Sequence, residues 1–214
     1  MHSEQFQDFD AFSESVRDLD CTMMLQNPAR RSWHIRAAEI AGLRVQMGQL
    51  GSGNIVEGQS WVDGSMIYLP LSDACAYSAN ASEIKKGSFM TLDPGTEFSL
   101  STKLEHDWCS ISVPSHVLDR DPDAEEPSKA AREEGCRVTR ANRVLASQFQ
   151  ASVRTVLTTS ARYPQFESSL AAAVAAADLL ELSTRVLGRR RQRNTDHAGR
   201  FKEDGATLRV SDQL

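Results

Sequence analysis

The chain has 214 residues, of which 40% are hydrophobic and 25% are charged, and its net charge is -5. This balance is ordinary for a globular protein, and the negative net charge excludes a nucleic-acid footprint spread over the whole molecule. Any contact with nucleic acid must therefore come from a local basic patch.

The first segment predicts one short helix within residues 6–25. Its apolar residues recur at steps of three and four, which puts them on one helical face: Phe6, Phe9, Phe12, Val16 and Leu19. Asn27-Pro28 ends the helix. The acidic start is unlike a signal peptide, and no apolar run reaches membrane-spanning length. We therefore expect a cytoplasmic protein with no membrane partner.

From Trp33 onward the hydrophobic period changes to two, which predicts strands. Leu43, Val45 and Met47 alternate with Arg44, Gln46 and Gly48, a pattern typical of a half-buried strand. Further candidate strands cover residues 55–62, 66–71, 74–77, 83–85, 89–92, 97–100 and 108–113. Pro70 indicates an edge strand or a bulge. About eight short strands separated by turns predict a sandwich or a small barrel.

Asp93-Pro94-Gly95 separates two of these strands and predicts a tight corner. Proline fixes φ and glycine tolerates a positive φ, so the tripeptide favours a turn by a known mechanism. We expect a strand, a corner and another strand, with the rest of the β region folded around them.

Residues 119–135 form an acidic connector, and residues 136–188 predict two helices joined as an αα-hairpin. The first helix has one apolar stripe: Val138, Ala141, Leu145, Phe149, Val153 and Val156. The second is apolar over most of its circumference and ends at Gly188. A second copy of the chain is expected to cover it, through Leu145, Leu179, Leu182 and Val186. The alternative is that the β region alone buries both helices.

The sequence thus divides into residues 1–118, an N-terminal helix with the β domain, the connector 119–135, the helical segment 136–188 and a basic remainder, 189–214. The basic run is a candidate for phosphate contact through Arg189, Arg190, Arg191 and Arg193.

Catalytic patterns are absent from the sequence. The five histidines are scattered without an H-x-H pair, so no metal site is expected, and no cofactor motif occurs. His106 is interpreted as a loop or surface residue, and Cys109 as an inert core thiol. The four cysteines are expected to be reduced. We predict that the protein is not an enzyme.

Aromatic residues of the predicted strands are the candidates for lining a ligand cavity. They are Trp61, Tyr68 and Trp108. The alternative is that all three only fill the core.

Short motifs then resemble a known family. They are similar to the cupin-like sensor domain of AraC-family transcriptional regulators. The motifs are Tyr68-Leu69-Pro70-Leu71, Asn80, the run from Gly87 to Glu97, and Ile111-Ser112-Val113-Pro114. In that family a β domain, two helices and a basic linker precede a DNA-binding domain with helix-turn-helix units.

The resemblance extends to residues 201–214, which are similar to the start of that DNA-binding domain. The recognition helix would lie beyond Leu214, so we expect only weak, non-specific DNA binding from this chain.

The resulting prediction is an α+β fold, a cupin-like β-barrel or sandwich followed by an αα-hairpin. The resemblance implies the effector-sensing and dimerising part of an AraC-type regulator, which forms a homodimer, binds a small-molecule effector and needs no cofactor. Two alternatives stay open: a cupin-fold enzyme, and a stand-alone interaction protein that pairs with full-length regulators.

Overall fold

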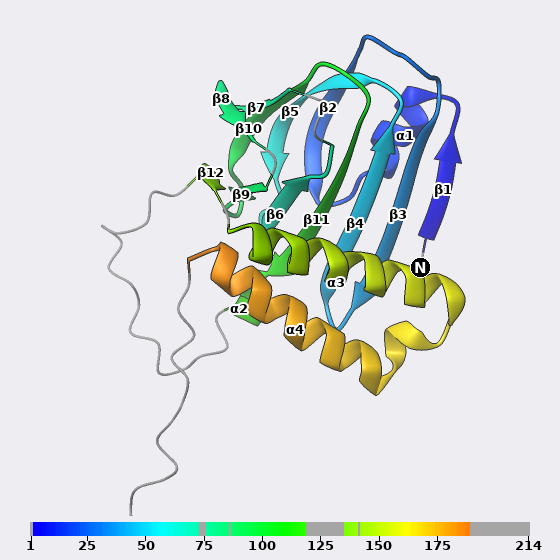
Figure 1. Cartoon of the computed structure of the whole chain (residues 1–214), viewed down its shortest axis with the longest axis vertical. Helices are drawn as coiled ribbons and strands as arrows, with labels where there is room; N and C mark the ends of the chain where they lie inside the picture. Colours follow the sequence, from blue (N-terminus) through cyan, green and yellow to red (C-terminus); the bar gives the residue numbers. More distant parts are fainter. Residues whose placement is uncertain (1, 73–75, 86, 119–134, 141, 189–214) are drawn as a thin grey trace, which may run out of the picture.

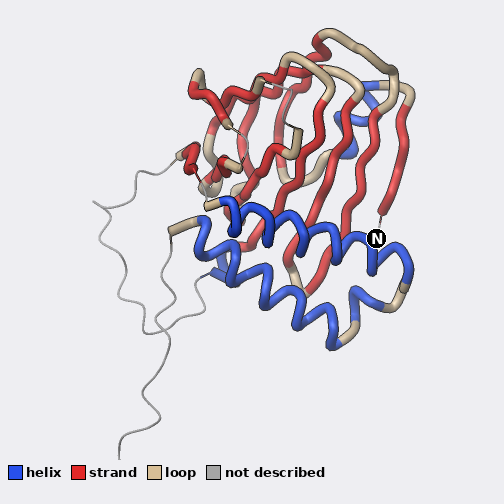
Figure 2. Tube along the Cα trace, viewed as in Figure 1, coloured by secondary structure: helices blue, strands red, loops and turns tan. Residues whose placement is uncertain are grey.

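The computed structural model describes residues 2–72, 76–85, 87–118, 135–140 and 142–188. These residues form two antiparallel sheets and a helical layer (Figure 1). One hydrophobic core lies between the two sheets, and a second lies between the larger sheet and the helices. Figure 2 shows the long helices together on one side of the strands. The α+β class is therefore confirmed.

The larger sheet has seven strands in the order β1-β3-β4-β11-β6-β9-β12. Their bounds are β1 His2–Phe6, β3 Trp33–Ile40, β4 Leu43–Leu50, β6 Gly64–Pro70, β9 Ser88–Leu92, β11 His106–Pro114 and β12 Cys136–Arg140. Ala41 and Gly42 join β3 to β4 with φ values of 47° and 83°. Two successive positive φ values form the tight hairpin turn that matches the strand twist.

The smaller sheet has five strands in the order β2-β5-β10-β7-β8. Their bounds are β2 Leu19–Gln26, β5 Gly53–Ser60, β7 Tyr77–Ala79, β8 Ser82–Ile84 and β10 Glu97–Thr102. Among the described strands, no pairing closes the two sheets into one barrel. Of the two predicted architectures, the sandwich describes this arrangement.

The predicted N-terminal helix is shorter than expected. Helix α1 covers Phe9–Ser15, and the Asp8 side chain caps it by accepting from the Ala11 amide. Phe6 and Leu19 lie in strands instead, because β1 pairs with β3 and β2 pairs with β5. Long-range pairing here overrides a local helical pattern.

The edge position predicted from Pro70 was wrong. Strand β6 lies between β11 and β9, near the middle of the larger sheet. Strand β6 pairs with β9 only from Met66 to Tyr68. The amide of Leu71 donates to Asp107 in β11, so Pro70 faces the β9 side, beyond the last paired residue. The missing N–H of Pro70 therefore costs no ladder bond.

Strand β4 lies in the interior of the larger sheet and is mostly buried on both faces, so the half-buried pattern predicted for it was also wrong. Leu43, Val45 and Met47 do share one face, and it packs against the helices. Gln46 on the opposite face is buried as well, because that face covers the interior of the sandwich.

The corner at Asp93-Pro94-Gly95 is confirmed, and it joins the two sheets. The Thr96 amide donates to the Asp93 carbonyl at 3.2 Å, and Gly95 has φ 67°. The Asp93 carboxylate accepts from the Gly135 amide at 3.1 Å and from Arg137 at 3.3 Å. One aspartate therefore ties the start of β12 to the corner.

The helical segment begins later than predicted. Val138 lies in β12, opposite Met90 of β9, and Ala141 falls outside the described residues. Strand β12 therefore belongs to the larger sheet. Helix α3, Arg143–Arg162, starts after the Asn142 cap.

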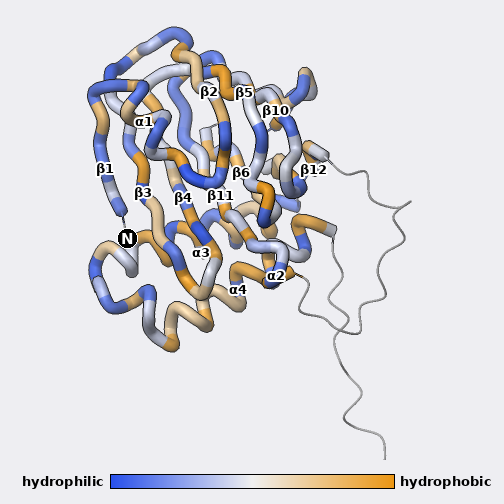
Figure 3. The backbone as a smooth tube through the Cα atoms, turned by 180° about the vertical axis from the view of Figure 1, so that it is seen from behind, coloured by the Kyte–Doolittle hydropathy of each residue, from blue (hydrophilic) through white to orange (hydrophobic). Residues whose placement is uncertain are grey.

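The second long helix, α4, covers Leu170–Val186 and follows the short helix η2, Phe166–Ser168. Helices α3 and α4 pack against each other and the sheet, and hydrophobic colours mark α4 in Figure 3. The short helix α2, Ser115–Leu118, ends the stretch that follows β11. No helix in the described part has the length and hydropathy needed to cross a bilayer.

Candidate functional site

The interior of the sandwich contains a cavity of about 40 Å³. Helix α1 and strands of both sheets line it. The residues of the larger sheet that line it are Gln46, Leu50, Met66, Tyr68, Met90, Leu92, His106, Trp108 and Ser110. The opposite wall consists of Leu19, Met23, Asn54, Val56, Phe98 and Leu100, with Phe12 and Val16 at the α1 side. A lining that is mostly apolar with a few polar groups is the usual composition of a small-molecule site.

Two of the predicted aromatic residues form one wall of this cavity. The Tyr68 and Trp108 rings are stacked, with centroids 5.7 Å apart and an interplanar angle of 27°. Their strands, β6 and β11, are neighbours in the larger sheet. The pair gives the cavity a flat apolar surface next to the Tyr68 hydroxyl.

The third aromatic candidate, Trp61, does not line the cavity. The Arg44 guanidinium lies over its ring, 4.9 Å from the centroid, in a cation–π contact. Arg44 also forms an ion pair with the buried Asp18 carboxylate. The cavity prediction for Trp61 was therefore wrong, because its ring lies against Arg44 and beside Gly64 and not on the cavity wall.

Most polar side chains on the cavity wall already have partners. Gln46 accepts from the Arg17 amide at 3.1 Å and donates to the Arg17 carbonyl at 3.2 Å. Asn54 accepts from the Thr102 hydroxyl at 2.6 Å. The Ser110 hydroxyl, on a residue that is 1% exposed, has no hydrogen-bond partner among the described residues. This hydroxyl can therefore both donate a hydrogen bond to a ligand and accept one from it.

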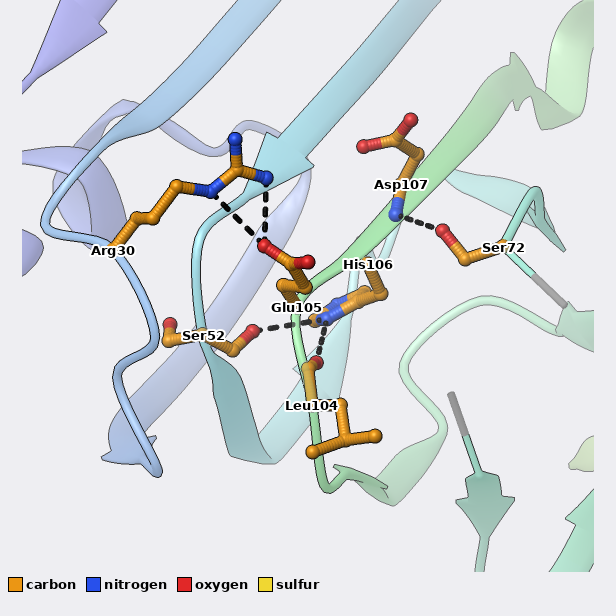
Figure 4. A network of polar contacts seen from close by, with 7 residues as sticks. All are labelled: Arg30, Ser52, Ser72, Leu104, Glu105, His106 and Asp107. Atoms are coloured by element: carbon orange, nitrogen blue, oxygen red, sulfur yellow. Dashed lines mark hydrogen bonds and ion pairs between the residues drawn. The ribbon is translucent and has the colours of Figure 1, made fainter. Parts of the chain in front are cut away.

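His106 is buried at one end of the cavity, so its prediction as a loop or surface residue was wrong. It is 3% exposed, and its ring makes an edge contact with Tyr77, with centroids 5.4 Å apart. Its Nδ1 lies 3.1 Å from the Ser52 carbonyl and 3.0 Å from the Leu104 carbonyl (Figure 4). Both partners accept, so Nδ1 carries the proton and Nε2 keeps the lone pair.

Burial lowers the pKa of His106, against smaller opposing contributions from its backbone hydrogen bonds and from Asp107. Desolvation penalises the imidazolium, so the neutral ring is the form that faces the cavity at neutral pH.

The loops around His106 close this end of the sandwich. Arg30 donates to the Glu105 carboxylate at 3.0 and 2.6 Å, and the Asp107 amide donates to Ser72 at 2.7 Å (Figure 4). The Arg30–Glu105 pair is solvent-exposed, so it orders the loop more than it stabilises the fold.

The thiols in the described part offer no activated nucleophile. Burial raises the pKa of Cys109 to about 12 and that of Cys21 to about 11, and it also raises the pKa of Cys136. Cys109 is fully buried, as predicted for a core thiol. Within the described ranges no three His, Cys, Asp or Glu side chains cluster as metal ligands. The absence of a metal stays a prediction.

The residues predicted for dimerisation lie in the chain's own core. Leu179, Leu182 and Val186 are buried against the larger sheet and α3, and Leu145 is partly buried beside them. The larger sheet and α3 therefore cover these side chains within one chain, so the premise that a second copy must cover them was wrong, whereas Leu170 and Val174 of α4 stay exposed. Dimerisation itself stays a prediction. The predicted phosphate contacts, Arg189, Arg190, Arg191 and Arg193, lie outside the described residues, as does most of the acidic connector.

Among the polar residues of the cavity wall, sequence reasoning missed Gln46, Asn54, His106 and Ser110. The signal that could have found two of them is the period of two along β11. His106, Trp108 and Ser110 share one face of that strand, and Trp108 was already a cavity candidate.

Comparison with solved structures shows the kind of fold. The chain is similar to the AraC-like transcriptional activator CuxR, with a TM-score of 0.60 and 10% identity over 87% of this chain and 69% of that one. Its likeness to an ethanolamine utilization protein Q of Salmonella typhimurium LT2 is lower, with a TM-score of 0.31 and 8% identity over 45% of this chain and 97% of that one.

An oxalate decarboxylase matches with a TM-score of 0.30 and 11% identity over 45% of this chain and 28% of that one. No family model matches the sequence, and no curated protein matches it. At these identities the comparison establishes a fold shared with an AraC-like activator.

Proposed function

We propose that the chain is the effector-sensing and dimerising part of an AraC-type transcriptional regulator. The sandwich binds a small effector in its interior, α3 and α4 act as an αα-hairpin for dimerisation, and the basic run after Gly188 leads toward DNA. The observation that carries the proposal is the likeness to CuxR over 87% of the chain, at a TM-score of 0.60. The mostly apolar cavity between the two sheets supports the sensing role.

The dimer surface that we propose is the outer face of α4 near its start. Leu170 is 82% exposed and Val174 is 58% exposed. Ala171 and Ala177 are also exposed on this side, and small residues let two helices approach closely. Exposed large apolar side chains next to small ones fit a second copy of the same helix, and two-fold pairing is the commonest symmetry of oligomers.

A fusion experiment tests this role. The full chain is joined to a DNA-binding domain that binds its operator only as a dimer, and repression of a reporter gene is measured. We expect repression, and we expect it to be lost when Leu170→Glu and Val174→Glu are combined, because a charge would be desolvated in the interface. Val144→Glu is the matched control, since Val144 is 59% exposed on α3. A fusion that does not repress, in a chain that sedimentation shows to be folded and monomeric, would contradict the proposal.

The other roles stay without a supporting observation. A cupin-fold enzyme would need groups that bind or activate a substrate, whereas the described cavity wall offers one neutral histidine and one free serine hydroxyl. We propose that the protein is not an enzyme, that it acts in the cytoplasm, and that it binds DNA only through weak, salt-sensitive phosphate contacts of the basic run.

A further inference from the structure

We propose that the cavity binds a small, uncharged ligand with a single hydroxyl or similar polar group, anchored on the Ser110 hydroxyl. The inference rests on the proposed sensing function and adds to it the chemical class of the effector. Three independent observations carry it: the charge of the wall, the unused hydroxyl and the volume of the cavity.

The wall excludes charged ligands. The described residues that line it include no Asp, Glu, Lys or Arg, and their only titratable group besides the Tyr68 phenol is His106, which burial keeps neutral. Moving a carboxylate or an ammonium group into such a space without a counter-charge is unfavourable by many kcal/mol. A phosphate, a carboxylic acid or an amine would therefore have to bind in an uncharged form, which is rare near neutral pH for each of them.

The Ser110 hydroxyl supplies the anchor. It lies in β11 between Gln46 of β4 and Tyr68 of β6, which pair with it directly across the sheet. The side-chain amide of Gln46 already accepts from the Arg17 amide and donates to the Arg17 carbonyl. The Ser110 hydroxyl, in contrast, forms no hydrogen bond with any described residue. A buried hydroxyl without a partner is unfavourable for folding, and a ligand that bonds to it removes that penalty. The ligand needs only one donor or acceptor to do so.

The volume limits the size of the ligand. A cavity of about 40 Å³ holds roughly three or four water-sized probes, which corresponds to a ligand of about four to six non-hydrogen atoms. His106 lies four residues before Ser110 on the same strand, so about 13 Å separates their backbones. A ligand of this size therefore reaches Ser110 or the His106 Nε2, and cannot bridge them.

Ser112 provides a matched control. It lies on the same strand and the same face as Ser110, is fully buried, and its hydroxyl also has no partner among the described residues. Ser112 does not line the cavity. Ser112→Ala therefore makes the same chemical change in the same setting without touching the ligand space.

The experiment uses three probes of one shape: cyclopentanol, cyclopentane and cyclopentanecarboxylate at pH 7.5. Binding to the purified full chain is followed by the thermal unfolding midpoint and by tryptophan fluorescence, because Trp108 lines the cavity. We expect cyclopentanol to bind more tightly than cyclopentane, and the carboxylate to have no effect. Ser110→Ala should weaken cyclopentanol about fivefold to tenfold and leave cyclopentane unchanged. Ser112→Ala should leave both affinities within about twofold.

Several results would overturn the inference. The carboxylate could bind as tightly as the alcohol, cyclopentanol could fail to bind at all, or Ser110→Ala could leave the affinity for cyclopentanol unchanged. The reporter fusion described above contains no ligand, so it reports on the regulatory role separately. Repression by the fusion together with failure of the alcohol would reject the ligand class alone.

Discussion

The indole ring of Trp108 occupies the space that a Cβ atom on Gly48 would need. An ideal Cβ built on Gly48 would lie 2.5 Å from Trp108 Cε2 and Nε1 and 2.7 Å from Cζ2. The two residues are directly paired on β4 and β11. Glycine at position 48 therefore lets the ring lie flat on the sheet and stack against Tyr68.

Gly48→Ala should displace the Trp108 ring and destabilise the fold by about 1–3 kcal/mol, as overpacking of a filled core does. Urea unfolding monitored by circular dichroism gives the size of the effect. Phenylalanine lacks the Nε1 and Cζ2 atoms, so the same change in a Trp108→Phe background should cost much less. Equal costs in the two backgrounds would mean that the ring is not the obstacle.

Leu179→Ala should lower the free energy of unfolding by about 2–5 kcal/mol, because Leu179 is fully buried between α4 and the larger sheet. Leu170→Ala in the same helix should change stability by less than about 0.5 kcal/mol, since that side chain is mostly exposed. Denaturant midpoints measured at one protein concentration compare the two variants. A larger loss from Leu170→Ala would place the core of this layer elsewhere.

The stability of the protein should fall as the pH drops below about 6.5, the ordinary pKa of an unfolded histidine. Burial lowers the pKa of His106 in the folded state. Between the lowered folded value and the unfolded value, the unfolded chain binds more protons, so protonation favours unfolding. Above that window the stability contributed by the neutral ring is fully present.

His106→Asn isolates this effect, because an asparagine amide can still donate to the Ser52 carbonyl and does not titrate. Urea midpoints at pH 7.5 and pH 5.5 should converge in the variant relative to the unmodified chain. An unchanged pH dependence would assign it to other groups.

Asp93→Ala should loosen β12 more than the rest of the larger sheet. The change removes the bonds from the Gly135 amide and from Arg137 that hold the start of this edge strand. We expect amide exchange over residues 136–140 to accelerate by about tenfold, while β4 and β11 keep their protection. Glu83→Ala removes an exposed ion pair with Lys85 and should leave exchange in β12 unchanged.

The sequence predicted what depends on local chemistry. The corner at Asp93-Pro94-Gly95, the shared face of Leu43, Val45 and Met47 in β4 and the end of α3 before Pro164 all follow from the residues themselves. The failures lie where distant strands meet. Val138 fits a helical stripe, yet it pairs with Met90, and Leu19 fits one too, yet it pairs with Ser60.

The site was less predictable than the fold. Tyr68 and Trp108 were found because large aromatic residues in strands tend to meet inside a sandwich. His106 and Ser110 were not, because their role depends on burial, and burial depends on which sheet covers them. Strand β11 lies between β4 and β6 in the larger sheet. Once this position is known, the alternation of side chains along β11 places both His106 and Ser110 on the face that lines the cavity.

The two walls of the cavity differ in what lies behind them. On the face of β11 that points away from the cavity, Cys109, Ile111 and Val113 pack against the helical layer, whereas the outer faces of β2 and β10 carry exposed or half-buried residues. Truncating Met23, Val56 or Leu100 to enlarge the cavity therefore changes the five-stranded sheet, whose outer face contacts solvent and no further layer of the described structure. Truncating Trp108 instead changes β11, so it also disturbs the packing of β11 against α3 and α4. Variants selected for larger ligands should accumulate their substitutions on the five-stranded side and leave β11 unchanged.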